Sequence, residues 1–298
     1  MPRVRPSATT WPATTPDYTG RRYNRNVLEN RQELASGKVD EGSGKTTSHV
    51  LESNGWPEDG LPPEACSLEL RKRVLALVPY FAGLDEPTLE RVHGTFHAVH
   101  MTRGSTILTE GEAAERFYVI ASGRVKLGQA TSSGAQHLLD VLGPGDSFGA
   151  LPLLGQTRND SEAQALTSGC LLVASAEEFG ALVREFPQVA VAVLEDVSSR
   201  LRDAQTRLRD SGTAPVESRL AASLLTLSER LGRPEDDGAG RTLGAPLSQE
   251  DLAALTGSTL ETVNRVLAQW RSRGLVRTAR RQITLLDLPA LREVAEGE

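Results

Sequence analysis

The residues best suited to chemistry lie near the C-terminus, on a helix that the sequence predicts from Ser258 to about Arg273. One face of this helix, close to its start, carries Leu260, Glu261, Asn264 and Arg265. An arginine can pair with both O6 and N7 of a guanine, and a glutamate can accept a hydrogen bond from N4 of a cytosine. Such a face is typical of a helix that reads base edges in the major groove of DNA.

Helix signals on either side place this face in a helix-turn-helix. Ser248 and Asp251 have the spacing of a capping box that starts a short helix, and Gly257 ends that helix. Ser258 and Glu261 predict a second capping box at the start of the next helix. The opposite face of this second helix is apolar and is expected to pack inward through Val263, Val266, Leu267 and Trp270. Two short helices joined by a glycine turn form the helix-turn-helix arrangement.

A hairpin wing is predicted after Gly274, with strands at 275–276 and 283–285 and with Arg280 and Arg281 at its tip. Between residues 248 and 286 six arginines stand against three acidic residues, although the whole chain carries a net charge of −6. A local excess of positive charge suits contact with phosphates. The alternative is a helical bundle with a solvated basic face. The predicted DNA-binding residues are Ser258, Thr259, Leu260, Glu261, Asn264, Arg265, Arg280 and Arg281.

A long helix is predicted over residues 187–211, ahead of this module. Its apolar residues alternate at spacings of four and three over roughly three heptads, which is typical of a coiled-coil seam. The predicted dimer seam consists of Leu194, Val197, Leu201, Ala204 and Leu208. The alternative is a helix that packs only on its own domain. A further amphipathic helix is predicted over 216–231, opened by Pro215.

Residues 66–186 have a different pattern, with two helical segments followed by short strand-like runs that glycines separate. Short strands with turn residues at this spacing indicate a compact antiparallel roll. The expected fold class is therefore α+β. It combines an N-terminal antiparallel β-roll, a long dimerisation helix over 187–212 and a C-terminal winged helix-turn-helix over 213–288.

The two ends of the chain are predicted to be tails, over residues 1–65 and 289–298. The first holds seven prolines and no sustained apolar period, so it is expected to be a disordered polar segment. Within it, residues 42–46 imitate a phosphate-binding loop. The glycine that this motif needs five residues before Gly44 is replaced by Val39, so we interpret the match as chance.

Cys66 and Cys170 are the two cysteines of the chain. They are too few for a disulfide framework, a four-thiolate zinc site or an iron–sulfur cluster. We expect them to lie far apart, with Cys170 as a small core residue in a strand. A reducing cytoplasm is the expected compartment. The sequence predicts neither a membrane-spanning run nor a signal peptide.

His93, His97 and His100 lie close together in the sequence and could suggest a haem or metal ligand set. A structural or surface role is the interpretation that we favour. Paired carboxylates, a nucleophile elbow and a cluster of metal ligands are not apparent in the sequence, so no enzymatic activity is predicted.

The order of roll, long helix and winged helix-turn-helix resembles the Crp–Fnr family, named after the cyclic-AMP receptor protein and the fumarate–nitrate regulator. The resemblance covers roughly residues 75–288, and its motifs are Glu110–Glu112, Phe117–Gly123, Leu142–Gly149 and Glu261–Arg265. It implies that Glu261 and Arg265 read the operator. Members resembling the cyclic-AMP receptor protein have an arginine where Leu260 stands, which leaves the outer base of the half-site open. The pattern is nearer the fumarate–nitrate regulator, without the cysteines of its cluster.

The resemblance also implies an effector pocket in the roll. In the cyclic-nucleotide binders of this family a glutamate holds the ribose hydroxyl and an arginine pairs with the phosphate. Ala150 and Asp160 stand at the matching positions, although Arg158 lies near enough to serve if the loop is remodelled. Cyclic nucleotide is therefore not expected to bind in the usual mode, and no cofactor is predicted. The candidate effector residues are Gly149, Ala150, Leu151, Arg158, Asp160 and Ser161.

The function implied by the resemblance is that of a homodimeric transcription regulator on double-stranded promoter DNA. Its operator is expected to be a pseudo-palindrome with a TGA-like core in each half-site, and RNA polymerase is a further expected partner. A small molecule of unknown identity is the candidate effector. A constitutive regulator with a purely structural roll fits the sequence as well. A cyclic-nucleotide-binding regulatory module for an enzyme is a third hypothesis, against which Ala150 and Asp160 argue.

Overall fold

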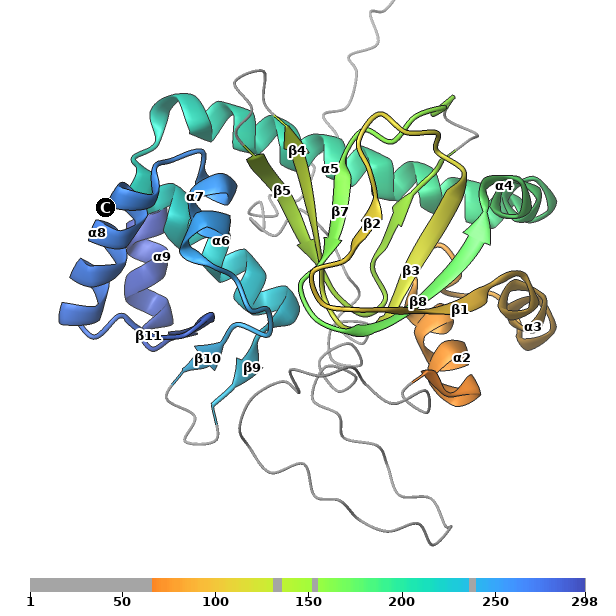
Figure 1. Ribbon diagram of the computed structural model, residues 1–298, viewed down its shortest axis with the longest axis horizontal. Helices are drawn as coiled ribbons and strands as arrows, with labels where there is room; N and C mark the ends of the chain where they lie inside the picture. Colours follow the sequence, from red (N-terminus) through yellow and green to blue (C-terminus); the bar gives the residue numbers. More distant parts are fainter. Residues whose placement is uncertain (1–65, 131–135, 152–154, 236–239, 298) are drawn as a thin grey trace, which may run out of the picture.

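The structure is a computed structural model of the 298-residue chain, and it describes residues 66–130, 136–151, 155–235 and 240–297. The predicted polar tail at 1–65 and the phosphate-loop imitation within it lie outside the described residues. The described chain forms a β-roll, a long helix and a C-terminal helical domain (Figure 1). This arrangement confirms the predicted α+β fold class.

The roll consists of two four-stranded antiparallel sheets with the strand orders β1-β8-β3-β6 and β2-β7-β4-β5. The strands of the first sheet are β1 (His97–Met101), β8 (Gly169–Ser175), β3 (Arg116–Ser122) and β6 (Ser147–Gly149). Those of the second are β2 (Thr106–Leu108), β7 (Glu162–Ala165), β4 (Val125–Ala130) and β5 (Gln136–Leu142). Between β3 and β4, Gly123 takes a positive φ of 91°.

Alternation along β3 and β8 gives the first sheet two buried faces. On β3, Tyr118 and Ile120 point into the core between the two sheets, whereas Phe117 and Val119 face the helices on the outside. These helices are α2 (Leu68–Leu77), α3 (Glu86–Thr95) and α4 (Ala176–Glu185). Because successive side chains of a strand point to opposite faces, a near-continuous apolar run is what a sheet buried on both sides requires.

A disulfide bond joins Cys66, just before α2, to Cys170 in β8, with the two Cα atoms 5.9 Å apart. The expectation that these cysteines lie far apart is wrong. They are separated by 104 positions in the sequence, and α2 folds back over the outer face of the sheet to bring them together. Cys170 is a buried core residue in a strand, as predicted.

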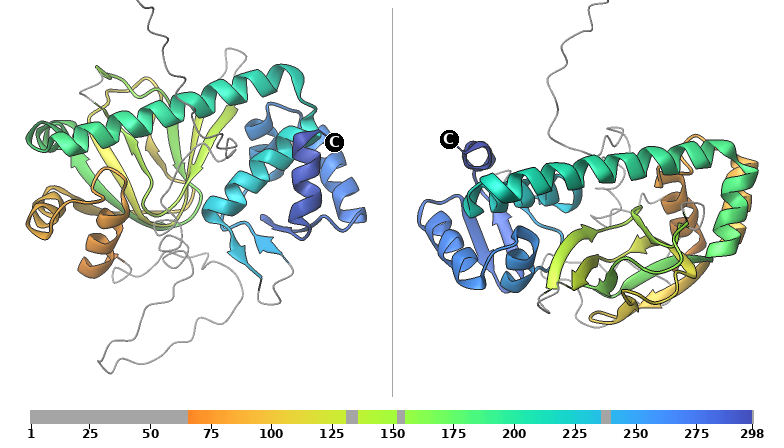
Figure 2. Two further views of the ribbon diagram at one scale, coloured as in Figure 1. Left: turned by 180° about the vertical axis from the view of Figure 1, so that it is seen from behind. Right: turned by 90° about the horizontal axis from the view of Figure 1, so that it is seen from above.

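Helix α5 (Pro187–Thr213) follows α4 directly and runs along the roll to the C-terminal domain (Figure 2). Its first turns are anchored in the apolar cluster between the helices and the outward face of the first sheet, here called the outer core. Val189 and Val193 are buried in this cluster. Among the described residues, no helix combines the length and the apolar character needed to cross a membrane.

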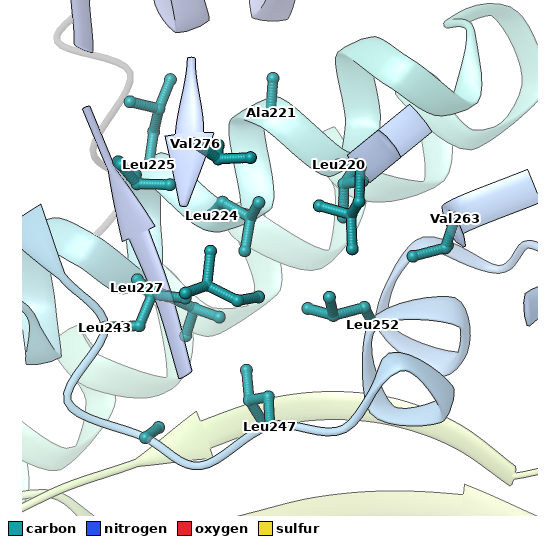
Figure 3. Packing of buried hydrophobic residues seen from close by; sticks show 14 of the residues in the cluster. Leu220, Ala221, Leu224, Leu225, Leu227, Leu243, Leu247, Leu252, Val263 and Val276 are labelled. Atoms are coloured by element: carbon teal, nitrogen blue, oxygen red, sulfur yellow. The ribbon is translucent and has the colours of Figure 1, made fainter. Parts of the chain in front are cut away.

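The C-terminal domain is built on α6 (Val216–Leu231), whose leucines converge on Leu252 of α7 (Gln249–Thr256) and Val263 of α8 (Leu260–Ser272) (Figure 3). Two short strands, β9 (Arg233–Pro234) and β10 (Arg241–Thr242), extend the sheet of the wing hairpin. The wing itself consists of β11 (Val276–Ala279) and β12 (Gln282–Leu285).

The last residues form helix α9 (Leu288–Glu296), so the predicted tail at 289–298 is wrong for most of its length. Asp287 caps this helix by accepting a hydrogen bond from the Ala290 backbone N–H, and a proline occupies its first turn. Leu291 is fully buried in the core of the domain. The apolar spacing of Leu288, Leu291 and Val294 was the available signal for the helix.

The roll and the C-terminal domain share one continuous core. Leu138 and Val141 of β5 belong to the same buried cluster as the leucines of α6. Polar contacts flank this cluster: Lys126 of β4 forms an ion pair of 2.8 Å with Asp251 of α7, and Arg230 of α6 forms one of 2.8 Å with Asp140 of β5. A displacement of β4 and β5 would therefore act directly on the helices of the helix-turn-helix that contact them.

Candidate nucleic-acid interface and effector cavity

Helix α7 starts at the predicted capping box. The Ser248 hydroxyl accepts a hydrogen bond from the Asp251 N–H at 3.0 Å, and the Asp251 carboxylate accepts one from the Ser248 N–H at 2.9 Å. The helix ends at Gly257, which adopts a left-handed conformation with φ 58°. A glycine takes this conformation without the steric cost that a side chain would add. The turn therefore sets the direction of α8.

Helix α8 begins one residue later than predicted. Its N-cap is Thr259, whose hydroxyl accepts from the Thr262 N–H at 3.2 Å, so the predicted capping box of Ser258 with Glu261 is wrong. Glu261 is consequently the second helical residue, not the third from which a side chain reaches back to the cap. Its exposed carboxylate stays available to a partner near the positive end of the helix.

The inner face of α8 holds the helix firmly in the domain. Val263, Val266, Leu267 and Trp270 are all buried, as predicted. Trp270 donates from Nε1 to Glu217 Oε1 on α6 at 2.6 Å, which satisfies the polar atom of a fully buried indole. A recognition surface gains precision from this rigid support.

The outer face of α8 leaves two charged residues exposed, Glu261 and Arg265, together with Leu260, whose side chain is 39% exposed. Asn264 lies on the same face but is half-buried, and its amide oxygen is buried without a hydrogen-bond partner among the described residues. The exposed charged groups at the start of this face are therefore those of Glu261 and Arg265, which are one helical turn apart.

The wing has the predicted hairpin form, with Ala279 opposite Gln282 in the register of β11 and β12. Arg280 and Arg281 make the exposed turn between them, and Arg281 has a φ of 57°. This left-handed conformation costs an ordinary residue about 1–2 kcal/mol, which glycine avoids. A cationic side chain is thus placed at the tip of the wing where glycine would be more stable.

Three of the six arginines between residues 248 and 286 form polar contacts within the C-terminal domain. Arg277 pairs with Glu235 at 2.5 Å, and Arg273 lies 4.0 Å from Glu217. Arg271 donates to the Thr278 hydroxyl at 3.3 Å. The local charge excess counted from residues 248–286 is therefore partly offset by glutamates outside that range, which the sequence count missed. Arg265, Arg280 and Arg281 remain as exposed cations on the faces expected to meet DNA.

The roll contains a cavity of about 540 Å³ at the predicted effector position. Five of the six candidate residues line it: Gly149, Leu151, Arg158, Asp160 and Ser161. Ala150 does not, because it is fully buried and its backbone N–H donates to the Arg116 carbonyl at 2.8 Å. Its backbone is thus committed to the sheet edge rather than to a ligand.

Sequence reasoning missed the wall of the cavity that α5 supplies. Arg200 and Val197 of this helix line it together with Tyr80, which follows α2. Arg200 donates from Nε to Asp196 Oδ2 at 2.7 Å and from Nη2 to the Ser147 carbonyl at 3.1 Å. The spacing of Asp196 and Arg200 is visible in the sequence only as a pair on one helix, so nothing there indicates their contact with the roll.

Tyr80 joins this polar group from the other side. Its hydroxyl donates to Asp196 Oδ2 at 2.5 Å, and the ring is 2% exposed. Burial raises the pKa of Tyr80 well above its usual value, and the neighbouring Asp196 carboxylate adds to the effect. The phenol therefore stays protonated and remains a hydrogen-bond donor to the helix.

Two charged candidates at the cavity are also hydrogen-bonded. Arg158 donates from Nη1 to the Gly111 carbonyl at 2.7 Å, and the Asp160 carboxylate accepts from Gln156 Nε2 at 3.1 Å. Both side chains are exposed at the rim. In the part of the chain that the structure describes, no cluster of three or more His, Cys, Asp or Glu side chains could hold a metal ion.

Comparison with known families matches both folded parts. Residues 98–186 match the family described as cyclic nucleotide-binding domain, and residues 218–294 match the Crp-like helix-turn-helix domain. A CRP-like cAMP-activated global transcriptional regulator of Mycobacterium tuberculosis is 30% identical, over 72% of this chain and 95% of that protein. The cyclic AMP receptor protein of Thermus thermophilus is 31% identical, over 74% of this chain and 97% of its own length.

The fold is also similar to solved structures. A transcriptional regulator of the CRP/FNR family from Thermus thermophilus superimposes with a TM-score of 0.56 and is 30% identical. The superposition covers 67% of this chain and 98% of that regulator. Nearly the whole of that protein therefore has a counterpart here.

Proposed function

Because the chain belongs to the Crp–Fnr family of transcription regulators, with its helix-turn-helix DNA-binding domain, we propose that it acts as a homodimer on a pseudo-palindromic operator. The observation that carries the proposal is the exposed pair Glu261 and Arg265 on a helix anchored by Trp270. Arg265 would pair with guanine, Glu261 would accept from cytosine, and Arg280 and Arg281 of the wing would contact phosphates.

Helix α5 supports the dimer. Val191, Leu194 and Leu201 follow one stripe of the helix and are 55%, 54% and 59% exposed, and exposed apolar side chains gathered on one face mark an interaction surface. Val197, which the sequence assigned to the seam, packs partly against the outer core of the roll. Ala204 is exposed, and the side chain of Leu208 lies outside the described part. The proposed seam is therefore centred on Leu194 and Leu201.

A twofold dimer matches a twofold operator. Two recognition helices related by the dimer axis would enter successive major grooves about 34 Å apart, one turn of DNA. By the family resemblance each half-site would carry a TGA-like core. RNA polymerase is the further partner that a regulator of promoters would meet, and the cytoplasm is the compartment in which it would act.

The cavity supports control by a small molecule. A ligand there would touch Arg158 and Asp160 of the roll and Arg200 of α5 at once, so its binding would bias the position of the dimerisation helix. The M. tuberculosis relative is described as cAMP-activated, but Ala150 and Asp160 replace the residues expected to hold a cyclic nucleotide. We therefore propose an effector other than cyclic nucleotide. A constitutive regulator is the alternative.

Selection of bound duplexes from a random pool by the purified full-length protein tests the proposal. We expect enrichment of a pseudo-palindrome whose half-site centres are about 34 Å apart. Enrichment of single, unpaired half-sites would contradict the dimeric mode, and no enrichment at all would contradict sequence-specific DNA binding. Repeating the selection without any added small molecule separates the two forms of control, since a constitutive regulator needs none.

A further inference from the structure

The disulfide between Cys66 and Cys170 is not explained by the needs of the fold. Cross-links are typical of small domains that cannot build a sufficient core. Here α2, α3, α4 and the first turns of α5 already bury an extensive apolar cluster against β3 and β8, with Phe81, Phe117 and Phe179 at its centre. The geometry is nevertheless suited to the bond, because the Cα separation of 5.9 Å falls in the usual range for disulfides.

A disulfide bond is unusual in a protein that is proposed to act in the cytoplasm. Thiol reductants keep most cytoplasmic cysteines reduced, and the disulfides found there are usually transient and catalytic or redox-sensing. We propose that Cys66 and Cys170 form a thiol–disulfide exchange site whose oxidation state sets the position of α5 and, through it, the affinity for DNA. This proposal rests on the proposed function and adds a control that needs no ligand in the cavity.

The two sulfurs differ in access, which defines the reaction. Cys66 is half-buried, whereas Cys170 is 3% exposed. The thiolate of a small thiol would attack Cys66 Sγ, the S–S bond would break, and its electron pair would leave on Cys170 Sγ, which takes a proton. A second thiolate then attacks the small-molecule sulfur of the mixed disulfide and releases Cys66 as a thiol. In sum, two thiols are oxidised to one disulfide and the protein disulfide is reduced.

A continuous path of contacts leads from this bond to the dimerisation helix. The disulfide fixes the start of α2 to β8. At the other end of α2 the chain reaches Tyr80, whose hydroxyl donates to Asp196 of α5 at 2.5 Å. Asp196 in turn accepts from Arg200 at 2.7 Å. Leu194 and Leu201 of the proposed seam are within two positions of these residues, so a shift of α2 would reach the seam.

The disulfide restricts the position of α2, and this restriction predicts whether oxidation raises or lowers the affinity for DNA. With the disulfide intact, α2 is held on the sheet and Tyr80 keeps its contact with Asp196, so α5 is held in one position. Reduction releases the start of α2 and allows other positions of α5. The oxidised protein should therefore bind DNA more tightly, by roughly 5- to 150-fold, the usual range of coupling between two sites.

The test uses the full-length protein in defined mixtures of reduced and oxidised dithiothreitol. Labelling of free thiols, read by mass spectrometry, gives the oxidation state, because the chain has two cysteines. Fluorescence anisotropy with the selected duplex gives the affinity at each ratio, and amide hydrogen exchange reports on α2 and α5. We expect affinity and protection of α5 to fall together as the free thiols appear.

Two variants act as controls. Cys66→Ser should bind like the reduced protein and should not respond to dithiothreitol. Tyr80→Phe should still form the disulfide but lose most of the redox response, because the contact with Asp196 is removed.

Equal DNA affinity of the oxidised and reduced wild type would overturn the proposal, as would a full redox response in Cys66→Ser. Failure of both states to bind any duplex would instead contradict the proposed function. Hydrogen exchange would then decide the redox proposal by itself: unchanged protection of α5 on reduction overturns it, and lower protection supports it.

Discussion

Arg281 combines a backbone conformation suited to glycine with a side chain suited to phosphate. Its φ of 57° is in the left-handed region. Arg281→Gly should therefore stabilise the domain by about 1 kcal/mol, because the steric cost at this position is removed. The same variant should weaken binding to all duplexes alike and lower the salt dependence by the share of one phosphate contact. Urea unfolding and anisotropy titrations at several salt concentrations measure the two effects.

Arg280→Ala is the matched control for this variant, since Arg280 is exposed in the same turn. Arg280 does not have a positive φ, so its replacement should weaken DNA binding without the gain in stability. A loss of sequence preference in Arg281→Gly would show that the wing reads bases and would contradict its assignment to phosphates.

The cavity predicts weak or absent binding of cyclic AMP in the family's usual mode. A buried phosphate needs a cationic partner, whereas Asp160 would bring a second negative charge to the position expected for the arginine. Isothermal titration should give no Kd tighter than about 10 μM, equivalent to about −7 kcal/mol. A tighter Kd that Arg158→Ala abolishes would contradict this prediction and would assign the phosphate to Arg158.

At the scale of residues, the sequence predicts what depends on near neighbours. The capping box of Ser248 with Asp251 and the inward face of Trp270 follow from spacings of three and four, and the structure has both. It misplaced the cap of α8, because Ser258 and Thr259 are both good N-caps and only the packed turn decides between them. Arg200 and Tyr80 were missed because their contacts join residues more than 50 positions apart.

Helix α5 carries the proposed dimer, so one substitution on its exposed stripe should separate the protomers. Leu201 is 59% exposed, and Leu201→Asp would place an unpaired charge in the seam. Light scattering at micromolar concentration should then report a monomer with an unchanged fold by circular dichroism. Leu68→Asp is the control, since Leu68 on α2 is similarly exposed, at 56%, and lies away from the stripe. A monomeric wild type at that concentration would contradict the proposed dimer.

The contact between β4 and α7 should make the stability depend on pH through Asp251. Burial raises the pKa of Asp251, but hydrogen bonds from Lys126 and Ser248 outweigh it and hold the pKa below its ordinary value of 3.8. Because the folded-state pKa is depressed, this stabilisation is present above about pH 4 and is lost as the pH falls through the folded pKa. Asp251→Asn should cost about 1–2 kcal/mol at pH 7, from the capping box and the ion pair together.

Urea unfolding of Asp251→Asn and wild type at neutral pH and near pH 3 tests whether the stabilisation by Asp251 is lost on acidification. The difference in unfolding free energy should shrink at the lower pH, because below the ordinary carboxylate pKa the unfolded state takes up a proton that the folded state binds only at still lower pH. Glu250→Gln is the neighbouring control, because Glu250 is exposed and should show little difference at either pH. A difference that grows on acidification would show that Asp251 does not act as a carboxylate here.

At the scale of elements, strong periodicity predicted the helices of residues 187–231 and the wing hairpin nearly as the structure has them. Helix α9 was missed, since a short apolar pattern near the end of a chain resembles a tail until its partner α6 is known. The predicted seam stays a prediction: Leu194 and Leu201 are exposed, whereas Val197 packs partly against the roll. Heptad spacing identifies an apolar stripe, but which of its residues face the roll depends on the packing of α5.

At the scale of the whole molecule, the two proposed sensors act on one helix. The cavity touches α5 through Arg200, and the disulfide reaches it through Tyr80 and Asp196. The continuous core between the β4–β5 hairpin and the helix-turn-helix supplies a second route from the roll to the DNA-binding face. None of these long-range contacts follows from spacing in the sequence, because each joins segments that only the fold brings together.

Helix α8 is proposed to read base edges in a twofold operator. The affinities of wild type and Arg265→Ala for the selected duplex, and for duplexes with the half-site guanine replaced, test this role. We expect Arg265→Ala to cost about 1–3 kcal/mol per half-site on the selected duplex and to bind the replaced duplexes as well as the selected one. An unchanged preference for the selected guanine in Arg265→Ala would contradict the assignment of α8 as the recognition helix.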